Sequence, residues 1–298
     1  MGIKLNSQYL DEIVSNHTDE FKQLIKSLTS KQLTKDLSKC ILDIRQLPGS
    51  NYVVGVSLKL EDVTTEVIIK YMKRKNSNLI DEQYTSMVLR ELGLNTYKIL
   101  PSNNGIWGLI EPVKGSVLDN IELTHNDKTI LSYFLGQLAR IDGIIWDTHP
   151  LNIIYNTKAK IPTRIDLERG LQVHLDIANS IGIFELATWE NILDIKTEVR
   201  AVKALRKLIT IYGPIFKQGF YDMDVILKKN KTTLVHICSE AANNSKTNIK
   251  KEHVRLLEEH INLNPTEIWN EIKIWRIEQA KIISINYIGE DPDAWLYL

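Results

Sequence analysis

The sequence has 298 residues but only two cysteines, no apolar run long enough to span a membrane, and no net charge. Cys40 and Cys238 lie among apolar residues, so we interpret them as small core residues and expect neither a disulfide framework nor a cysteine metal site. The first residues lack the apolar core of a signal peptide, which predicts a cytoplasmic protein. Because 37 basic residues balance 37 acidic ones, there is no strong signal for nucleic-acid binding.

Three polar residues follow one another at a spacing that is typical of phosphotransferases. Asn152 lies five residues after Asp147, and Asp166 lies fourteen residues after Asn152. A carboxylate accepts a hydroxyl proton or orients the nucleophile, and an amide oxygen beside a second carboxylate offers the hard oxygen ligands that Mg²⁺ prefers. The apolar stretches 153–155 and 163–165 predict two short strands that carry these groups to one edge.

The segment Asp147–Ile153, which reads DTHPLNI, resembles the catalytic loop of the protein kinase-like superfamily in its atypical branch. It is similar to the D-x-H-P-x-N-I loop of aminoglycoside and choline phosphotransferases, and equally to the D-R-H-x-x-N loop of phosphoinositide, actin-fragmin and HipA-type kinases. The stretch 135–145, a helix leading directly into the loop, favours the second group. The segment Ile165–Glu168 favours the first, whose metal motif often reads I-D-x-E. Both groups stay open, and Glu168 is either a further metal ligand or a surface charge.

The resemblance makes Asp147 the catalytic base and Asn152 and Asp166 the ligands of Mg²⁺. It also assigns residues that come earlier in the chain. Lys70 ends a predicted buried strand and would bind the ATP phosphates, with Glu82 of the following helix as its partner. Further on, the resemblance implies a hinge between two lobes that offers backbone groups to adenine, at Glu111 and Val113.

Two features of ordinary kinases are missing from the sequence. No glycine triplet G-x-G-x-x-G precedes Lys70, and the only turn available there contains Gly49, Ser50 and Asn51. The resemblance implies that this turn holds phosphates through backbone N–H groups and the serine hydroxyl. There is also no recognisable activation loop, so we expect no regulation by phosphorylation of such a loop.

The resemblance implies an α+β protein with a two-lobed kinase-like fold. Residues 1–38 have helical spacing and would form an N-terminal helical extension. Residues 39–115 alternate as strands around one helix at 79–92 and would form a small, β-rich N-lobe that binds the nucleotide. Residues 116–298 would form a larger helical C-lobe that carries the catalytic and metal loops.

These observations predict a kinase that uses ATP and Mg²⁺ and moves the γ-phosphate to a hydroxyl group of a protein or a small molecule. Two alternatives stay open. In the first, the chain is a catalytically weak, nucleotide-binding pseudokinase that acts as an interaction module. In the second, it is a kinase-fold enzyme that transfers AMP. The sequence indicates no membrane span and leaves the oligomeric state undetermined.

Overall fold

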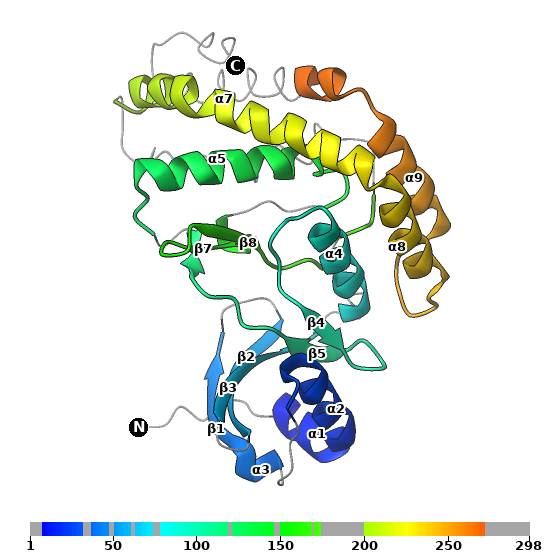
Figure 1. Cartoon of the computed structure of the whole chain (residues 1–298). Helices are drawn as coiled ribbons and strands as arrows, with labels where there is room; N and C mark the ends of the chain where they lie inside the picture. Colours follow the sequence, from blue (N-terminus) through cyan, green and yellow to red (C-terminus); the bar gives the residue numbers. More distant parts are fainter. Residues whose placement is uncertain are drawn as a thin grey trace.

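The computed structural model describes residues 8–31, 37–47, 51–60, 63–73, 78–118, 121–145, 150–168, 170–173 and 200–271, and everything below concerns these residues. A sheet with three helices forms one end of the molecule, and long helices form the other end (Figure 1). Helix α4 and a second, small sheet lie between the two ends.

The N-terminal sheet is antiparallel and has the strand order β1-β2-β3-β5-β4. Its strands are β1 (Ile41–Gln46), β2 (Tyr52–Leu60), β3 (Val63–Tyr71), β4 (Ile99–Pro101) and β5 (Trp107–Ile110). The β-branched residues of β2 and β3 favour this conformation, as the sequence predicts. The central strand β3 pairs with β2 on one side and β5 on the other, so Lys70 lies opposite Val53 and Gly108.

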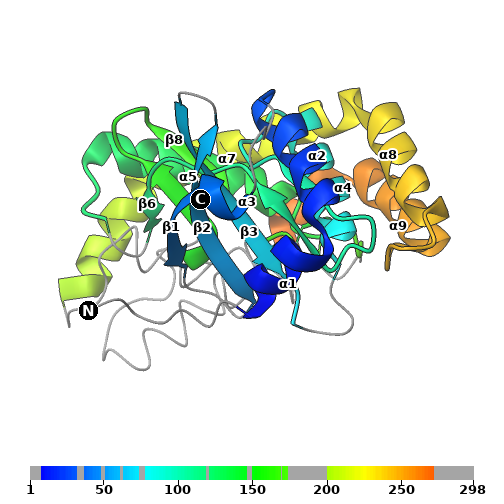
Figure 2. The same cartoon turned by 90° about the horizontal axis from the view of Figure 1, so that it is seen from below.

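One face of this sheet is covered by the N-terminal helices α1 (Gln8–Asn16), α2 (Thr18–Thr29) and α3 (Leu37–Cys40). Phe21 and Ile25 of α2 share one buried cluster with Val54, Val67 and other residues of the sheet. Because side chains alternate along a strand, the residues that pack on these helices leave Lys70 on the opposite face. Figure 2 shows α1 and α2 lying along the sheet. The helical extension therefore completes the core of the small lobe.

Helix α4 (Leu79–Glu91) follows β3 and occupies the predicted position. It begins where the Asn78 side chain accepts a hydrogen bond from the backbone N–H of Ile80 at 2.8 Å. It ends before Gly93, whose φ of +74° belongs to the left-handed region that glycine adopts most readily. Val88 and Leu89 bury one side of α4 in the largest hydrophobic cluster, so the helix is packed against the C-terminal half.

The C-terminal half contains α5 (His125–Arg140), η2 (Pro150–Asn152), β7 (Ile153–Asn156), β8 (Ile161–Arg164), α7 (Arg200–Lys229), α8 (Lys231–Asn243) and α9 (Lys251–Asn262), followed by helical residues 265–271. The strands β7 and β8 pair with β6 (Ser116–Val117) in the small sheet. Helices α5 and α7 cross closely, since a Cβ atom added at Gly136 would lie 1.9 Å from the carbonyl oxygen of Phe216.

Helix α5 is fixed at its start by Asp127. The carboxylate accepts hydrogen bonds from Thr124, from Tyr155 of β7 at 2.6 Å and from Lys160 at 2.7 Å. Burial would raise the pKa of Asp127, but these hydrogen bonds hold it well below its usual range. Asp127 therefore stays ionised and ties α5 to the small sheet.

The end of α5 is fixed by Arg140, which is fully buried. Its Nε donates to Asp224 of α7 at 2.8 Å, and its Nη2 donates to the carbonyl oxygen of His260 of α9 at 3.3 Å. These contacts tie the end of α5 to α7 and α9.

The architecture confirms the predicted α+β class, with a β-rich N-terminal part and a helical C-terminal part. Both cysteines are buried, as expected. Within the described residues no helix combines the length and apolar character that crossing a bilayer requires. The lobe boundaries at residues 38 and 115 and the cytoplasmic location stay predictions.

Candidate active site

The ammonium group of Lys70 lies among three carboxylates. Its Nζ is 2.6 Å from Oε1 of Glu82, 3.1 Å from Oδ1 of Asp166 and 3.3 Å from Oε1 of Glu168. Only 7% of the Lys70 side chain is exposed, Glu82 is fully buried, and 42% of the Asp166 side chain is exposed. The structure thus brings together Lys70, Glu82 and Asp166, which lie up to 96 positions apart in the sequence.

Burial would lower the pKa of Lys70, but the carboxylates, Glu82 above all, hold it well above its usual value. The amine therefore stays protonated. Tyr97, which follows α4, adds to this arrangement because its hydroxyl donates to Oε2 of Glu82 at 3.0 Å. Burial and the adjacent carboxylate raise the pKa of Tyr97 well above that of an ordinary tyrosine, so the hydroxyl keeps the proton that it donates.

Asp166 has a left-handed backbone conformation, with φ of +56°. This conformation is uncommon for a residue with a side chain, although Asp adopts it more readily than most, and it costs on the order of 1 kcal/mol or more. Asp166 directly follows Ile165, whose backbone N–H donates to the carbonyl oxygen of Asn152 at 2.9 Å. Backbone strain of this kind gathers at functional sites, where the surrounding contacts hold it in place.

Asn152 is buried and ends η2, directly before β7. Its carbonyl oxygen also accepts a hydrogen bond from Nη1 of Arg164 at 3.1 Å, and the same nitrogen donates to the carbonyl oxygen of Ile165. The fully buried Arg164 guanidinium therefore joins the backbones of the two segments that carry the predicted metal ligands.

Asn51, directly before β2 of the N-terminal sheet, also contacts this cluster of charged residues. Its side-chain amide donates to Oε1 of Glu168, and its Oδ1 accepts from the backbone N–H of Lys73 at 3.2 Å. Asn51 is buried, and its side chain is thus bound to protein groups. The other two residues of the predicted phosphate turn, Gly49 and Ser50, lie outside the described residues, so the role of the turn stays a prediction.

Three predicted site residues remain. Asp147 lies outside the described residues, between Ile145 and Pro150. Glu111 and Val113 directly follow β5, the strand next to β3, at the point where the chain passes to the second lobe. The backbone N–H of Glu111 donates to the carbonyl oxygen of Lys98 at 2.9 Å.

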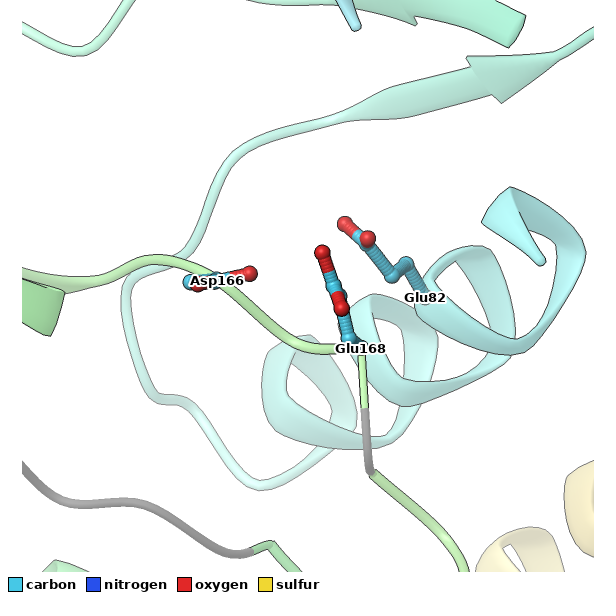
Figure 3. A group of neighbouring side chains, drawn as sticks. All are labelled: Glu82, Asp166 and Glu168. Carbon is cyan, nitrogen blue, oxygen red and sulfur yellow. The ribbon is translucent and has the colours of Figure 1, made fainter. Parts of the chain in front are cut away.

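The three carboxylates also form a possible metal site. One oxygen atom from each of Glu82, Asp166 and Glu168 lies within 4.8 Å of the others (Figure 3). All three carboxylates contact Lys70, but Glu82 is the nearest to it and is fully buried, so the oxygens of Asp166 and Glu168 suit a divalent cation better. Carboxylate oxygens are the hard ligands that Mg²⁺ prefers, so the oxygens of Asp166 and Glu168 fit this ion, and the part of the Asn152 amide stays a prediction.

Tyr97 and Arg164 were missed as functional residues by sequence reasoning. Neither belongs to a motif, and each acts through a contact with a residue distant in the sequence or with backbone atoms. Only Arg164 could have been found from the sequence, because an arginine within a predicted apolar strand needs buried partners. For Glu168, 12% of whose side chain is exposed, the structure excludes the interpretation as a surface charge.

No protein family and no curated protein matches the sequence. Similar solved structures include the open conformation of CtTel1, at 13% identity and a TM-score of 0.46 over 77% of this chain. The proinflammatory kinase CtkA of Helicobacter pylori is similar at 12% identity and a TM-score of 0.38, over 75% of this chain and 91% of CtkA. An ethanolamine kinase of Plasmodium vivax is similar at 11% identity and a TM-score of 0.39, over 91% of this chain and 93% of that enzyme. This chain spans only 12% of the length of CtTel1. Identities and TM-scores this low carry no information about a substrate.

Proposed function

We propose that this chain is a phosphotransferase that uses ATP and Mg²⁺ and moves the γ-phosphate to a hydroxyl group of a protein or a small molecule. The proposal depends above all on the Lys70 ammonium, which lies 2.6 Å from Glu82 and 3.1 Å from Asp166. Fold stability does not require such a cluster, since apolar residues of similar volume often stabilise a core as well as a buried ion pair does. A buried charged cluster of this kind supports a function in binding a charged ligand.

In the proposed mechanism Lys70, held in place by Glu82, binds the phosphates of ATP. Asp166, Glu168 and Asn152 would hold the metal, which would supply the charge neutralisation that phosphoryl transfer needs. Asp147 accepts the proton of the acceptor hydroxyl. The protein therefore contributes mainly positioning and electrostatic stabilisation.

The proposal puts the base of the nucleotide on the same face of the sheet as Lys70. Ile68 shares this face with Lys70, and its cross-strand neighbours are Gly55 on β2 and Ile110 on β5. In the proposal, adenine packs on these residues next to Glu111 and Val113. Since the N–H of Glu111 already donates to Lys98, Glu111 contributes its carbonyl oxygen.

Labelled ATP tests the proposal. The protein is incubated with cell lysate and ATP labelled at the γ-phosphate or, in parallel, at the α-phosphate, and the lysate is separated into protein, lipid, RNA and metabolite fractions. We expect γ-label in the protein or metabolite fraction and no transfer of α-label. Transfer of α-label would instead show AMP transfer, and nucleotide binding without any transfer would show a pseudokinase.

Three variants assign the activity to the site. Asp147→Ala and Asp166→Asn are expected to abolish transfer, because one removes the proton acceptor and the other a metal ligand. Asp43→Asn, at an exposed position on β1, is the matched control and should transfer label like the unchanged protein. If both site variants keep full transfer, the assigned residues do not carry the reaction.

A further inference from the structure

Helix α4 is held from the C-terminal half at the turn that carries Glu82. Asp81, its neighbour in the chain, is 1% exposed. The Asp81 carboxylate accepts the backbone N–H of Asn248 at 3.0 Å and the side-chain amide of Asn248 at 2.7 Å. Asn248 lies in the segment 244–250, which joins α8 to α9. A buried carboxylate of the small lobe is therefore paired with the helical hairpin α8–α9.

The same hairpin contacts α4 at both ends. The side chain of Asn78, which caps the start of the helix, donates to the carbonyl oxygen of Lys246. At the other end, Asn230 donates to the carbonyl oxygen of Glu91 at 3.4 Å. Helices α4 and α8 are also in contact along their length (Figure 1). The hairpin thus spans α4 from its first turn to its last.

Neighbouring residues on an α-helix point in directions about 100° apart. Asp81 consequently points to Asn248 while Glu82 points to Lys70, and one turn of α4 carries two buried anchors. Burial raises the pKa of Asp81, and the hydrogen bonds from Asn248 oppose this effect. If α4 moved away from the hairpin, the Asp81 carboxylate would lose the hydrogen bonds from Asn248, and hydrogen bonds to a charged group are worth more than neutral ones. The position of α4, and with it the Lys70–Glu82 contact, is therefore coupled to Asn248.

We propose that Asp81 and Asn248 are positioning residues that keep α4 where Glu82 binds Lys70. Through them, the α8–α9 hairpin determines whether Lys70 is held in the position in which it binds the nucleotide. The inference deepens the proposed function and rests on it for its catalytic consequence. The claim about the position of α4 does not rest on the proposed function, because the position of α4 and the pairing of Lys70 are measurable without any transfer reaction.

The test replaces the amide by a charge. Asn248→Asp places a second carboxylate against Asp81, and the repulsion displaces the first turn of α4. We expect faster amide hydrogen exchange in residues 79–85 and faster acylation of the Lys70 amine by a limiting amine-directed reagent, read by mass spectrometry. The KM for ATP should rise roughly tenfold, the equivalent of about 1.4 kcal/mol, with a smaller change in kcat.

Two further proteins separate positioning from general damage. The double variant Asp81→Asn with Asn248→Asp again places one carboxylate against one amide, and it should restore exchange, Lys70 labelling and KM. Asn243→Asp makes the same chemical change at an exposed position on the same hairpin and should resemble the unchanged protein.

The inference is overturned if Asn248→Asp speeds exchange only within 244–250 and leaves α4 and Lys70 as they were. It is also overturned if the double variant fails to rescue, because the effect is then loss of stability rather than of position. The milder Asn248→Ala variant provides the same measurements should Asn248→Asp fail to fold. If exchange and labelling change as expected in a protein that transfers no phosphate, the positioning role stands and the proposed function fails.

Discussion

Removing the Lys70 charge is the sharpest test of the charged cluster. Lys70→Met keeps a long apolar side chain but leaves three carboxylates without their common cation. Glu82 is fully buried and Glu168 nearly so, and breaking a buried pair on one side costs about 3–5 kcal/mol of unfolding free energy. Asp166, with 42% of its side chain exposed, adds only about 0–1 kcal/mol, as surface ion pairs do. We therefore expect a loss of about 3–5 kcal/mol at neutral pH, most of it due to Glu82.

The loss should depend on pH in a defined direction. Burial raises the pKa of Glu82, and Lys70 opposes this rise. Without Lys70 the pKa of Glu82 in the folded protein rises further above its unfolded value of about 4.3. A carboxyl group with a raised folded pKa favours folding when it is protonated, and this contribution disappears as the pH rises through the folded pKa. The variant should therefore lose least below about pH 5 and most above neutrality.

Urea unfolding followed by tryptophan fluorescence at pH 5 and pH 7.5 measures both effects. The double variant Lys70→Met with Glu82→Gln should recover most of the loss, because the fully buried carboxylate no longer carries a charge. Added Mg²⁺ should stabilise Lys70→Met more than the unchanged protein, since the carboxylate oxygens lie within 4.8 Å of one another. Lys59→Met, at an exposed position on the neighbouring strand, is the matched control. A loss below about 1 kcal/mol, typical of surface pairs, or one independent of pH would refute the geometry of the cluster.

Three further variants test the surroundings of the site. Tyr97→Phe removes a donor from the buried Glu82 carboxylate, so unfolding should become easier by about 1–3 kcal/mol and the KM for ATP should rise; an unchanged urea midpoint would contradict the contact. Gly136→Ala forces a Cβ into a backbone carbonyl of α7 and should lower stability by about 1–3 kcal/mol or more in thermal unfolding; unaltered thermal unfolding would mean that the helices cross less closely. Asp127→Asn should lower stability by about 1–3 kcal/mol at pH 7. The depressed pKa of Asp127 adds stability above its unfolded pKa, and this stability is lost progressively as the pH falls from there through the folded pKa. The difference between the two proteins in urea unfolding should therefore begin to shrink below about pH 4.

Much of the local structure was predictable from the sequence because it depends on neighbouring residues. The β-branched run before Lys70 indicates a strand, and β3 contains it. The helical spacing that closes on Gly93 predicts α4, since glycine adopts the left-handed conformation that ends a helix. The order of strand, helix, strand and polar motif was likewise predictable, and the structure keeps it.

The partner of each charged group was harder to predict. Helix α4 carries three acidic residues, Asp81, Glu82 and Glu91, and only the rotation of the helix about its axis decides which of them meets Lys70. Packing of Val88 and Leu89 in the core turns Glu82 toward Lys70 and Asp81 toward the opposite lobe. A helix sequence specifies which residues share a face, but the elements around it specify what that face meets.

The sequence by itself determined the kinds of element, their order and the polar residues that chemistry at a phosphate group requires. Tertiary structure alone decided that Asn51 meets Glu168 across 117 positions, and that Asp81 meets Asn248 across 167. Contacts over such separations depend on the packing of whole elements against one another. Propensity and periodicity act over a few residues and carry no information about that packing.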